Sequence, residues 1–264
     1  MSVYVCSDIH GQYTLYQKML EEINFSDSDT LYILGDMIDR GPESIELLKD
    51  VMQRRNVQCL LGNHELMMYE YYQHAKGEDA VWEYPNNGGR VTRKAFEKLT
   101  EDEQRTILDF VGDLPLQLEV TAGGTTFLLS HSSFLPDRGD AFWKSVPYRD
   151  AKNVVWNSPW RFWEYIPLSD YALDGRQHVI GHVPVQAVAK TNTDARERTC
   201  NGTKAYVDRD QGIVNIDLGC ALMNRHGRHS AGLALCCMDL EKFARGETDD
   251  AFLYIRQNNT GKEL

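Results

Sequence analysis

The stretch Leu34-Gly35-Asp36-Met37-Ile38-Asp39-Arg40-Gly41-Pro42 decides the fold of this chain. It ends the apolar run Leu31–Leu34, which predicts a short buried strand followed by a glycine-bounded turn. The turn places Asp36, Asp39 and Arg40 beyond the carboxyl end of that strand, where open α/β sheets hold their functional groups. Asp and Arg residues in a loop more often form only a surface ion pair. The rest of the chain therefore has to distinguish a structural turn from a functional one.

The composition is that of an ordinary soluble globular protein, since 42% of the 264 residues are hydrophobic and 25% are charged. No apolar run is long enough to cross a bilayer, and Met1 leads directly into the strand-like Val3–Cys6 without a signal-peptide pattern. We therefore expect a cytoplasmic location and no membrane partner. The net charge of −11 argues against nonspecific nucleic-acid binding but does not exclude a phosphorylated substrate.

The cysteines are expected to be reduced core residues. They are scattered, mostly in apolar runs, and form no Cys-x-x-Cys pair: Cys6, Cys59, Cys200, Cys220, Cys236 and Cys237. The adjacent residues Cys236 and Cys237 should point to opposite faces of one strand. We therefore predict packing rather than redox chemistry for these side chains.

The first 65 residues alternate between strand-like and helical patterns. Predicted strands cover Val3–Cys6, Leu31–Leu34 and Val57–Leu61, and predicted helices cover about Thr14–Ile23 and the stretch from Ile45 to Met52. Such alternation predicts a parallel or mixed sheet covered by helices. The length allows one large α/β domain or two small ones, and no boundary in the sequence favours two.

The character of the chain changes near residue 114. Residues 66–114 are mainly helical by pattern, with a break at Tyr84–Gly89, and Thr100 with Glu103 resembles a capping box that begins a helix. The tryptophan-rich segment from Phe142 to Tyr165 is predicted to be irregular. Further strands are predicted at Leu116–Val120, Thr125–Ser130, Gln177–Ile180, Ala205–Val207, Ile213–Ile216, Gly232–Met238 and Ala251–Arg256.

Residues of metal-ligand type stand directly after five of the predicted strands. They are Asp8 and His10, Asp36, Asn63 and His64, His131, and His182. Any one of them alone is more often a capping or turn residue than a ligand. If the strands lie side by side with their carboxyl ends together, however, all of these side chains converge at one edge of the sheet.

The donor set contains imidazole, carboxylate and amide groups without thiolate, which suits Mn, Fe, Zn, Co or Ni and argues against a structural zinc site. One ion would take Asp8, His10 and Asp36. A second ion would share Asp36 as a bridge, and its ligands would be Asp36, Asn63, His131 and His182. Two ions roughly 3.5 to 4 Å apart can share a water, lower its pKa and hold both oxygens of an in-line displacement at phosphorus.

Five sequence blocks occur in a fixed order from about Val3 to Gly219: Ser7–Gly11, Gly35–Gly41, Gly62–Glu65, His131 and Gly181–Pro184. This order resembles the calcineurin-like metallophosphoesterases, phosphoprotein phosphatase branch. The Asp39-Arg40-Gly41 sequence and the Asn87-Gly88-Gly89 insert resemble the bacterial and phage-type Ser/Thr phosphatases and their diadenosine tetraphosphatase relatives. The resemblance implies an α/β metallophosphoesterase fold, with two packed mixed β-sheets flanked by helices in four layers (α/β/β/α). It also implies a single domain over residues 1–264 with a mainly helical insert at about 66–114.

The resemblance implies a role for each site residue. The implied dinuclear metal ligands are Asp8, His10, Asp36, Asn63, His131 and His182. His64 is implied as the general acid that protonates the leaving alkoxide, with Asp39 orienting its ring. Arg40 is implied as a phosphate ligand through its planar donor fork, and Asn63 is a second phosphate-binding candidate. The alternative for Arg40 is a surface ion pair with Asp39 or Glu43. Glu65 is interpreted as a structural hydrogen-bonding carboxylate.

Several positions depart from the family pattern. Ser132-Ser133 follows His131 where the family usually has Ala-Gly, and Ser158 stands where a second phosphate-binding arginine usually lies. Arg161 would replace that arginine if Pro159 bends the loop, and otherwise it is a surface residue. The tryptophans are expected to pack in the core or at the rim of the cleft, and the polar loop with His226 and His229 is expected to be solvated.

The predicted function is metal-dependent hydrolysis of a phosphomonoester by a hydroxide that bridges two divalent ions, with Mn favoured and Fe, Zn, Ni or Co as alternatives. The favoured substrate class is phosphoserine or phosphothreonine in proteins. The main alternative is a dinucleoside polyphosphate such as diadenosine tetraphosphate, because the same motifs serve both reactions. A third hypothesis is a non-catalytic metal- or phosphate-binding regulator. Such a protein should have lost a ligand or the Asp39–His64 pair, and none of these residues is missing.

Overall fold

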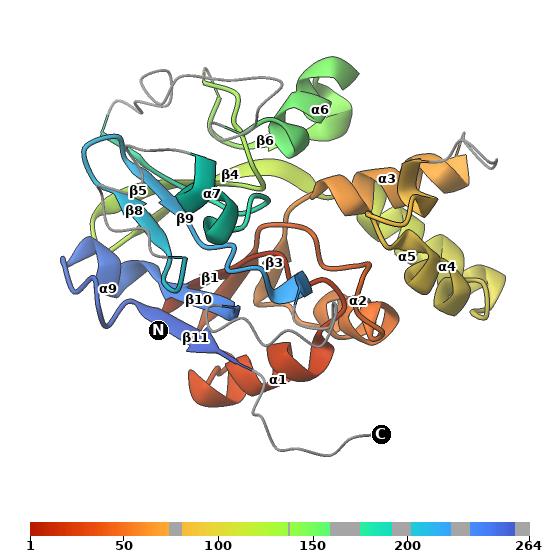
Figure 1. Cartoon of the computed structure of the whole chain (residues 1–264), viewed down its shortest axis with the longest axis horizontal. Coiled ribbons are helices and arrows are strands. Elements are labelled where there is room, and N and C mark those ends of the chain that lie inside the picture. The colour runs from red at the N-terminus through yellow and green to blue at the C-terminus, as the bar shows by residue number, and fades with distance from the viewer. Residues whose placement is uncertain (74–80, 137, 159–174, 192–201, 223–232, 257–264) are drawn as a thin grey trace.

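Two mixed β-sheets flanked by helices form the structure, a computed structural model that describes residues 1–73, 81–136, 138–158, 175–191, 202–222 and 233–256 (Figure 1). Within these residues the first sheet has the strand order β11-β10-β1-β2-β3, and the second has the order β6-β4-β5-β7-β9-β8. The two-sheet α/β arrangement predicted from the sequence is confirmed.

The strands are short and mostly buried. The first sheet contains β1 (Val3–Cys6), β2 (Thr30–Ile33), β3 (Val57–Cys59), β10 (Leu235–Asp239) and β11 (Phe252–Ile255). The second contains β4 (Pro115–Ala122), β5 (Thr125–Ser130), β6 (Ala141–Phe142), β7 (Gln177–Ile180), β8 (Tyr206–Asp208) and β9 (Ile213–Asn215).

Helices occupy the connections between the strands. The α-helices are α1 (Tyr13–Glu22), α2 (Ser44–Gln53), α3 (Asn63–Gln73), α4 (Gly89–Phe96), α5 (Glu101–Gly112), α6 (Tyr148–Trp156), α7 (Val185–Thr191) and α9 (Leu240–Ala244). Three short 3-10 helices are η1 (Val81–Glu83), η2 (Trp143–Ser145) and η4 (Cys220–Leu222) within the described ranges. Helices α1 and α2 lie together on one side of the first sheet in Figure 1.

Alternation along the strands of the first sheet divides their side chains between two apolar clusters. Val5 and Cys236 belong to a cluster that contains residues of both sheets, including Phe127 of β5. Cys6 and Cys237 belong to the other cluster, with residues of α1 and α2. The prediction that the adjacent cysteines face opposite ways is therefore confirmed. All five cysteines in the described part of the chain are buried free thiols, and Cys200 lies outside it.

Parallel pairing brings the carboxyl ends of the central strands to the same edges. In the first sheet β1, β2 and β3 are parallel, and in the second β5, β7 and β9 are parallel. Hydrogen bonds continue beyond the assigned strands, from Leu34 N to Cys6 O (2.9 Å) and from Leu60 N to Ile33 O (2.8 Å). The loops that follow these strands consequently start level with one another, as the ligand hypothesis requires.

One expectation was wrong. The tryptophan-rich segment from Phe142 to Tyr165 is not irregular throughout, because α6 occupies Tyr148–Trp156. Ala151, Val154 and Val155 are its buried residues, and their spacing is that of one helix face. The surrounding aromatic residues obscure this short apolar pattern in the sequence.

The predicted helical region between 66 and 114 contains most of α3, together with η1, α4 and α5. Helices α3, α4 and α5 lie together at one side of the sheets in Figure 1. The capping box at the start of α5 is confirmed. The Thr100 hydroxyl accepts a hydrogen bond from Glu103 N, and Thr100 N donates to the Glu103 carboxylate at 2.9 Å. These two bonds satisfy backbone donors at the end of the helix that would otherwise have no partner in the helix.

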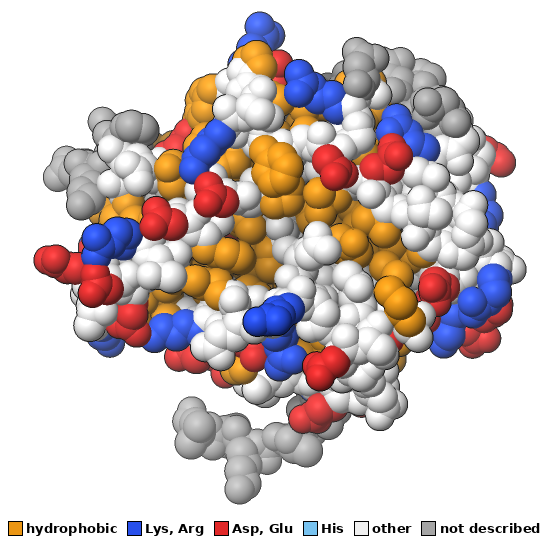
Figure 2. Space-filling model, turned by 180° about the vertical axis from the view of Figure 1, so that it is seen from behind, with side chains coloured by type: hydrophobic (Ala, Val, Ile, Leu, Met, Phe, Trp, Pro, Cys, Tyr) orange, Lys and Arg blue, Asp and Glu red, His pale blue; other side chains and the backbone are white. Residues whose placement is uncertain are grey.

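Charged side chains of both signs are interspersed around the face shown in Figure 2, and apolar side chains gather toward its middle. The part of this face that the structure describes therefore offers no continuous basic surface for a nucleic-acid backbone. Within the described ranges, every helix is too short or too polar to span a bilayer.

Replacing the capping threonine should weaken α5. We expect Thr100→Ala to lower the free energy of unfolding by about 1 kcal/mol, because the Glu103 N–H loses its acceptor. The measurement is urea denaturation at equilibrium. The control is Thr106→Ala on the same helix, an exposed residue whose hydroxyl donates to Asp102 O. The control should change stability by less than about 0.5 kcal/mol, and equal effects of the two variants would contradict the assigned role of Thr100.

Candidate metal centre

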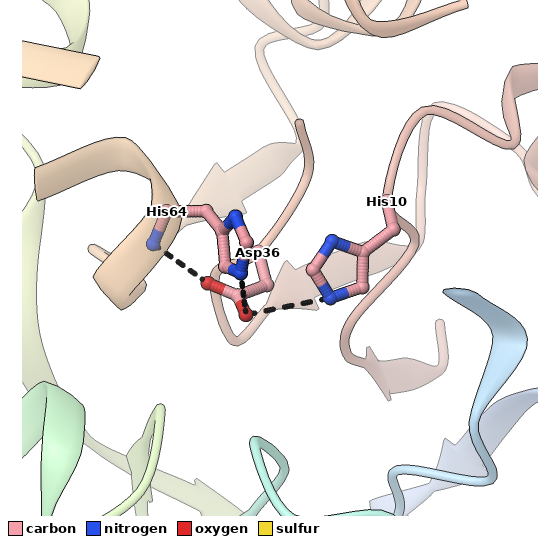
Figure 3. A group of neighbouring side chains, drawn as sticks. All are labelled: His10, Asp36 and His64. Atoms are coloured by element: carbon pink, nitrogen blue, oxygen red, sulfur yellow. Dashed lines mark hydrogen bonds and ion pairs between the residues drawn. The ribbon is translucent and has the colours of Figure 1, made fainter. Parts of the chain in front are cut away.

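The carboxylate of Asp36 lies in the middle of the site, between histidines that follow three different strands. Its Oδ2 atom is 3.5 Å from His10 Nε2 and 3.8 Å from His64 Nε2. Figure 3 shows both of these rings directed at the Asp36 carboxylate. The other oxygen, Oδ1, is 3.4 Å from His131 Nε2. Each oxygen thus faces its own set of imidazoles, which is the arrangement that a bridging ligand requires.

Backbone carbonyl groups determine which ring nitrogen of two histidines carries the proton. His10 Nδ1 lies 2.9 Å from Ile38 O, and His131 Nδ1 lies 2.7 Å from Leu34 O. A carbonyl oxygen can only accept, so both Nδ1 atoms must donate. The Nε2 lone pairs are then available toward Asp36, as in many histidines that ligate a metal.

Two groups of potential ligand atoms share Asp36. One contains His10, Asp36 and His64, and the other contains Asp36, His131 and His182; in each group the atoms lie within 4.8 Å of one another. Asn63 joins the second group, since its Oδ1 is 3.0 Å from His131 Nε2. His182 Nδ1 lies 3.2 Å from the same nitrogen. The donor set therefore fits two adjacent cations with a common carboxylate.

Asp8 connects the two sheets at the edge of this cluster. Its Oδ2 accepts hydrogen bonds from the Ser7 hydroxyl and, at 2.9 Å, from the backbone N–H of His182. Its Oδ1 is 4.0 Å from His10 Nε2. Gly181 permits this approach, because a Cβ atom there would come within 2.1 Å of Asp8 Oδ2. Asp8 thus borders the first ligand group. Glycine is required before His182 because any side chain there would collide with Asp8.

Asp39 and His64 form a buried pair, as predicted from the resemblance. His64 Nδ1 is 2.7 Å from Asp39 Oδ2, and both side chains are at most 1% exposed. The same Asp39 oxygen also accepts a hydrogen bond of 2.7 Å from the indole Nε1 of Trp82. Asp39 N donates to the hydroxyls of Ser44 and Thr92, each at 3.0 Å. One carboxylate oxygen and the backbone N–H of Asp39 are therefore both held by hydrogen bonds.

Arg40 points into the site and not to the surface. One terminal nitrogen of its guanidinium is 2.7 Å from His10 Nε2, and the other is 3.1 Å from His64 Nε2. Among the described residues, Arg40 forms no ion pair with Asp39 or Glu43. Glu43 accepts hydrogen bonds from Thr14 instead. A two-pronged donor beside the ligand cluster is suited to binding a phosphoryl group.

Glu65 fixes the turn that carries Asp36. Its carboxylate accepts backbone hydrogen bonds from Asp36 (2.8 Å), Met37 (2.8 Å), Ile38 (3.2 Å) and Gly62 (3.1 Å). The expected structural role of this residue agrees with these contacts. The N–H of His64, at the start of α3, donates to Asp36 Oδ1 at 3.1 Å. Helix α3 thus supplies both the anchor of the turn and a donor to the central carboxylate.

Backbone strain concentrates at the same residues. Seven non-glycine residues in the described ranges have positive φ, and six of them belong to the predicted site: Asp8, His10, Asp36, Asp39, Arg40 and His182. Such conformations cost about 1–3 kcal/mol each for residues with a Cβ atom and persist where the surroundings enforce them. Their clustering here indicates a site in which an unfavourable backbone conformation is maintained because it orients the functional side chains.

This geometry agrees with comparisons of the sequence with known families. A sequence model of the calcineurin-like phosphoesterases matches residues 1–193. The chain belongs to the calcineurin-like phosphoesterase family. The resemblance carried by the five sequence blocks is thereby confirmed.

Individual relatives of this phosphoesterase carry two kinds of name. Over 186 residues it is 30% identical to serine/threonine-protein phosphatase 1 of Salmonella typhimurium (strain LT2), covering 70% of this chain and 79% of that protein. Over 91 residues it is 41% identical to the symmetrical bis(5'-nucleosyl)-tetraphosphatase of Wigglesworthia glossinidia brevipalpis, covering 33% of this chain and 34% of that protein. The second match thus spans about a third of its relative.

The fold also matches a solved structure of a protein serine/threonine phosphatase from Saccharomyces cerevisiae. The TM-score is 0.52, and the alignment covers 90% of this chain and 72% of that chain at 14% sequence identity. At this level of identity the likeness supports the fold of the phosphoesterase alone.

Burial dominates the electrostatics of the phosphoesterase site. It raises the pKa of Asp36 to about 6 and that of Asp39 to about 7, although the nearby Thr92 hydroxyl and the hydrogen bond from Trp82 oppose the rise at Asp39. Burial lowers the pKa of His64 to about 4, and the Arg40 charge acts in the same direction while Asp36 opposes it. Bound divalent cations would favour ionised carboxylates and neutral imidazoles. The donor set is therefore chemically suited to cations.

Some sequence hypotheses fall on residues outside the described ranges. These are Arg161 as a second phosphate ligand, Trp160 and Trp163 as packing residues, and the loop with His226 and His229. Ser158, at the position of the usual arginine, is buried. The backbone after His131 is held by hydrogen bonds from the Ser132 hydroxyl to Asn157 O and from Ser133 N to Val154 O.

Sequence reasoning missed the contacts that hold Asp39. Trp82 is a buried packing residue as expected, but it also donates to the Asp39 carboxylate. Thr92 and Ser44 were not singled out at all. The only available signal was the Asn87-Gly88-Gly89 segment, which lies between Trp82 and Thr92. Gly88 O accepts from Arg40 N at 3.5 Å, so this segment also touches the turn.

Removal of the bridging carboxylate should affect both cations. We expect Asp36→Asn to weaken binding of two Mn²⁺ ions by more than about tenfold, whereas Asn63→Ala should mainly weaken one. Titration calorimetry and metal analysis after dialysis would measure both. The control Asp109→Asn changes an exposed carboxylate on α5 and should retain both ions. Loss of a single ion in the Asp36 variant would argue against the bridge.

Proposed function

We propose that this chain is a metal-dependent phosphomonoester hydrolase and that phosphoserine or phosphothreonine in proteins is its substrate class. The observation that carries the proposal is the position of Asp36, whose two oxygens face separate groups of imidazoles beside the guanidinium of Arg40. A cation pair next to a two-pronged donor is suited to a phosphoryl group with more than one negative charge. The family membership of the chain supports the same reaction class.

The residues that would hold two divalent ions come from the two groups and from Asp8 at the edge of the first, with Asp36 common to both ions and His64 kept for proton transfer. Asp8, His10 and Asp36 would hold one ion, and the ligands of the other would be Asp36, Asn63, His131 and His182. When bound, such ions supply a nucleophilic water at neutral pH and neutralise charge on the phosphoryl oxygens. We propose Mn²⁺ for both positions, with Fe, Zn, Ni or Co as alternatives, since carboxylate, amide and imidazole donors accommodate all of these ions.

Arg40 and Asn63 would bind the phosphoryl group. The two terminal nitrogens of Arg40 lie close to His10 and His64, so its fork is directed at the space between the two rings. Two parallel N–H donors from one guanidinium match two phosphoryl oxygens and fix their orientation. The Asn63 side chain lies on the other side of Asp36, beside His131. Together these donors would place the phosphorus atom close to the ligand cluster.

His64 would protonate the leaving oxygen. Burial and the Arg40 charge lower its pKa, and the negative charge of a bound phosphoryl group would raise that pKa again. Its Nδ1 is bound to Asp39, so its Nε2 is the nitrogen that faces Arg40 and Asp36. A serine or threonine alkoxide is a poor leaving group, and a proton delivered during P–O cleavage would lower the barrier to its departure. Asp39 would hold the ring in position and stabilise the protonated imidazole.

Hydrolysis of a dinucleoside polyphosphate is the second candidate. The observation in its favour is the 41% identity over 91 residues to a protein named as a symmetrical bis(5'-nucleosyl)-tetraphosphatase. The longer match, which covers 79% of its relative, is to a protein named as a serine/threonine-protein phosphatase, and for this reason we prefer the phosphoprotein substrate. A non-catalytic regulator is disfavoured because every proposed ligand and the Asp39–His64 pair are present.

A direct comparison of the two substrate classes tests the proposal. With added Mn²⁺, we expect phosphoserine and phosphothreonine peptides to be hydrolysed with a higher kcat/KM than diadenosine tetraphosphate. A chelator should abolish both activities, because the ligands alone provide no nucleophilic water. Product analysis by chromatography would measure each rate. Preferential cleavage of the dinucleotide would replace our choice of substrate, and metal binding without any turnover would support the regulator.

The general acid can be tested through the leaving group. His64→Ala should slow hydrolysis of alkyl phosphates by about 10²–10⁴-fold, because the alkoxide then leaves without a proton. Hydrolysis of nitrophenyl phosphate should fall much less, since nitrophenolate is a stable leaving group. Steady-state kinetics on both substrates measures the difference. Equal losses on both would exclude His64 as the acid.

A further inference from the structure

We propose that Trp82 is a positioning residue of this site: its indole N–H fixes the orientation of the Asp39 carboxylate, which in turn orients His64. The kinetic part of this inference rests on the proposed function, because it assumes that His64 delivers a proton to the leaving group. The structural part concerns a hydrogen bond between two side chains and stands on geometry alone.

Both donors to the Asp39 side chain meet the same oxygen atom. Trp82 Nε1 and His64 Nδ1 each lie 2.7 Å from Asp39 Oδ2. The other oxygen, Oδ1, is buried and has no hydrogen-bond partner among the described residues. The hydrogen bonds from these two donors therefore oppose rotation of the carboxylate about its terminal bond. Since His64 is the group that the carboxylate orients, Trp82 is the donor that can hold the carboxylate in place.

Trp82 is itself held firmly. Its side chain is 1% exposed, and its ring packs against Tyr71 and Tyr72 with centroid separations of 5.2 and 6.0 Å. The first residue of α4, Gly89, lies so close that a Cβ atom there would come within 2.5 Å of Trp82 Nε1. The indole is thus confined between α3 and the start of α4. Its N–H direction is therefore constrained by packing in addition to the bond to Asp39.

The same region also holds the backbone of Asp39. Asp39 has a φ of +74°, a strained value for a residue with a Cβ atom. Its N–H is shared between the hydroxyls of Thr92, on α4, and Ser44, on α2, and the Thr92 hydroxyl also contacts that of Ser44. Trp82 and Thr92 therefore hold opposite ends of one residue. The helical region from α3 to α4 serves as a support for the Asp39–His64 pair.

A merely structural role for Trp82 predicts a different outcome. A buried indole needs an acceptor for its N–H, and loss of such a bond would reduce stability without changing substrate preference. A positioning role predicts that its loss affects proton delivery selectively. The two roles can be separated by leaving-group dependence, as for His64, together with the melting temperature.

The experiment compares Trp82→Phe with Trp143→Phe in the full chain. Both substitutions keep an aromatic ring and remove an indole N–H, and Trp143 donates at 2.9 Å to Gly112 O, a backbone carbonyl at the end of α5. We expect Trp82→Phe to reduce kcat for an alkyl phosphate on the order of tenfold and kcat for nitrophenyl phosphate by less than about threefold. Trp143→Phe should leave the ratio of the two rates unchanged. Equal losses on both substrates, or no loss on either, would overturn the inference.

A second measurement does not depend on catalysis or on folding of the Trp82 variant. In protein labelled with ¹⁵N at tryptophan, Asp39→Asn should move the Trp82 indole proton resonance upfield, because a neutral acceptor replaces a charged one. The resonance of Trp143 should remain in place. An unchanged Trp82 resonance would overturn the inference. If the wild-type protein hydrolyses no phosphomonoester while this shift is observed, the proposed function fails and the positioning contact stands.

Discussion

The structure depends on one buried carboxylate, that of Glu65, which collects four backbone N–H groups from two separate loops. Three of these donors lie in the turn after β2, and the fourth is Gly62, just before α3. A buried carboxylate with several N–H donors is stable only where the chain supplies them in fixed directions. The turn is thus tied to the helix that follows the neighbouring strand. Asp36 acquires its central position from this connection.

Two apolar clusters pack around the turn and helix that Glu65 joins, and this packing maintains the strained backbone of the site residues. Residues of both sheets share one cluster, and residues of α1, α2 and α3 belong with the other face of the first sheet to a second cluster. Within this rigid surrounding, six site residues are kept at positive φ, and several titratable groups are kept away from water. Such conformations and such burial are individually unfavourable. The strained conformations and the buried titratable groups are maintained because any other arrangement of these residues would pack less well.

Most of the fold and much of the site could be predicted from the sequence, because the informative residues follow strand ends in a fixed order. Asp8, Asp36 and His131 were placed correctly relative to their strands for this reason. The partners of Asp39 could not be predicted, since the bond from Trp82 joins residues 43 positions apart and depends on how η1 packs against the turn. Helix α6 was missed because its short apolar face lies among unrelated aromatic residues. The inward direction of Arg40 likewise depends on tertiary packing, as its neighbours in sequence offered equally plausible partners.

The hydrogen bond between Asp8 and the backbone of His182 joins residues 174 positions apart. This separation has a consequence for biosynthesis. A growing chain contains the residues after β1, β2 and β3 long before His182 leaves the ribosome, so it can acquire the first ligand group well before the second. The full set of cation ligands can therefore be completed only after His182 has left the ribosome.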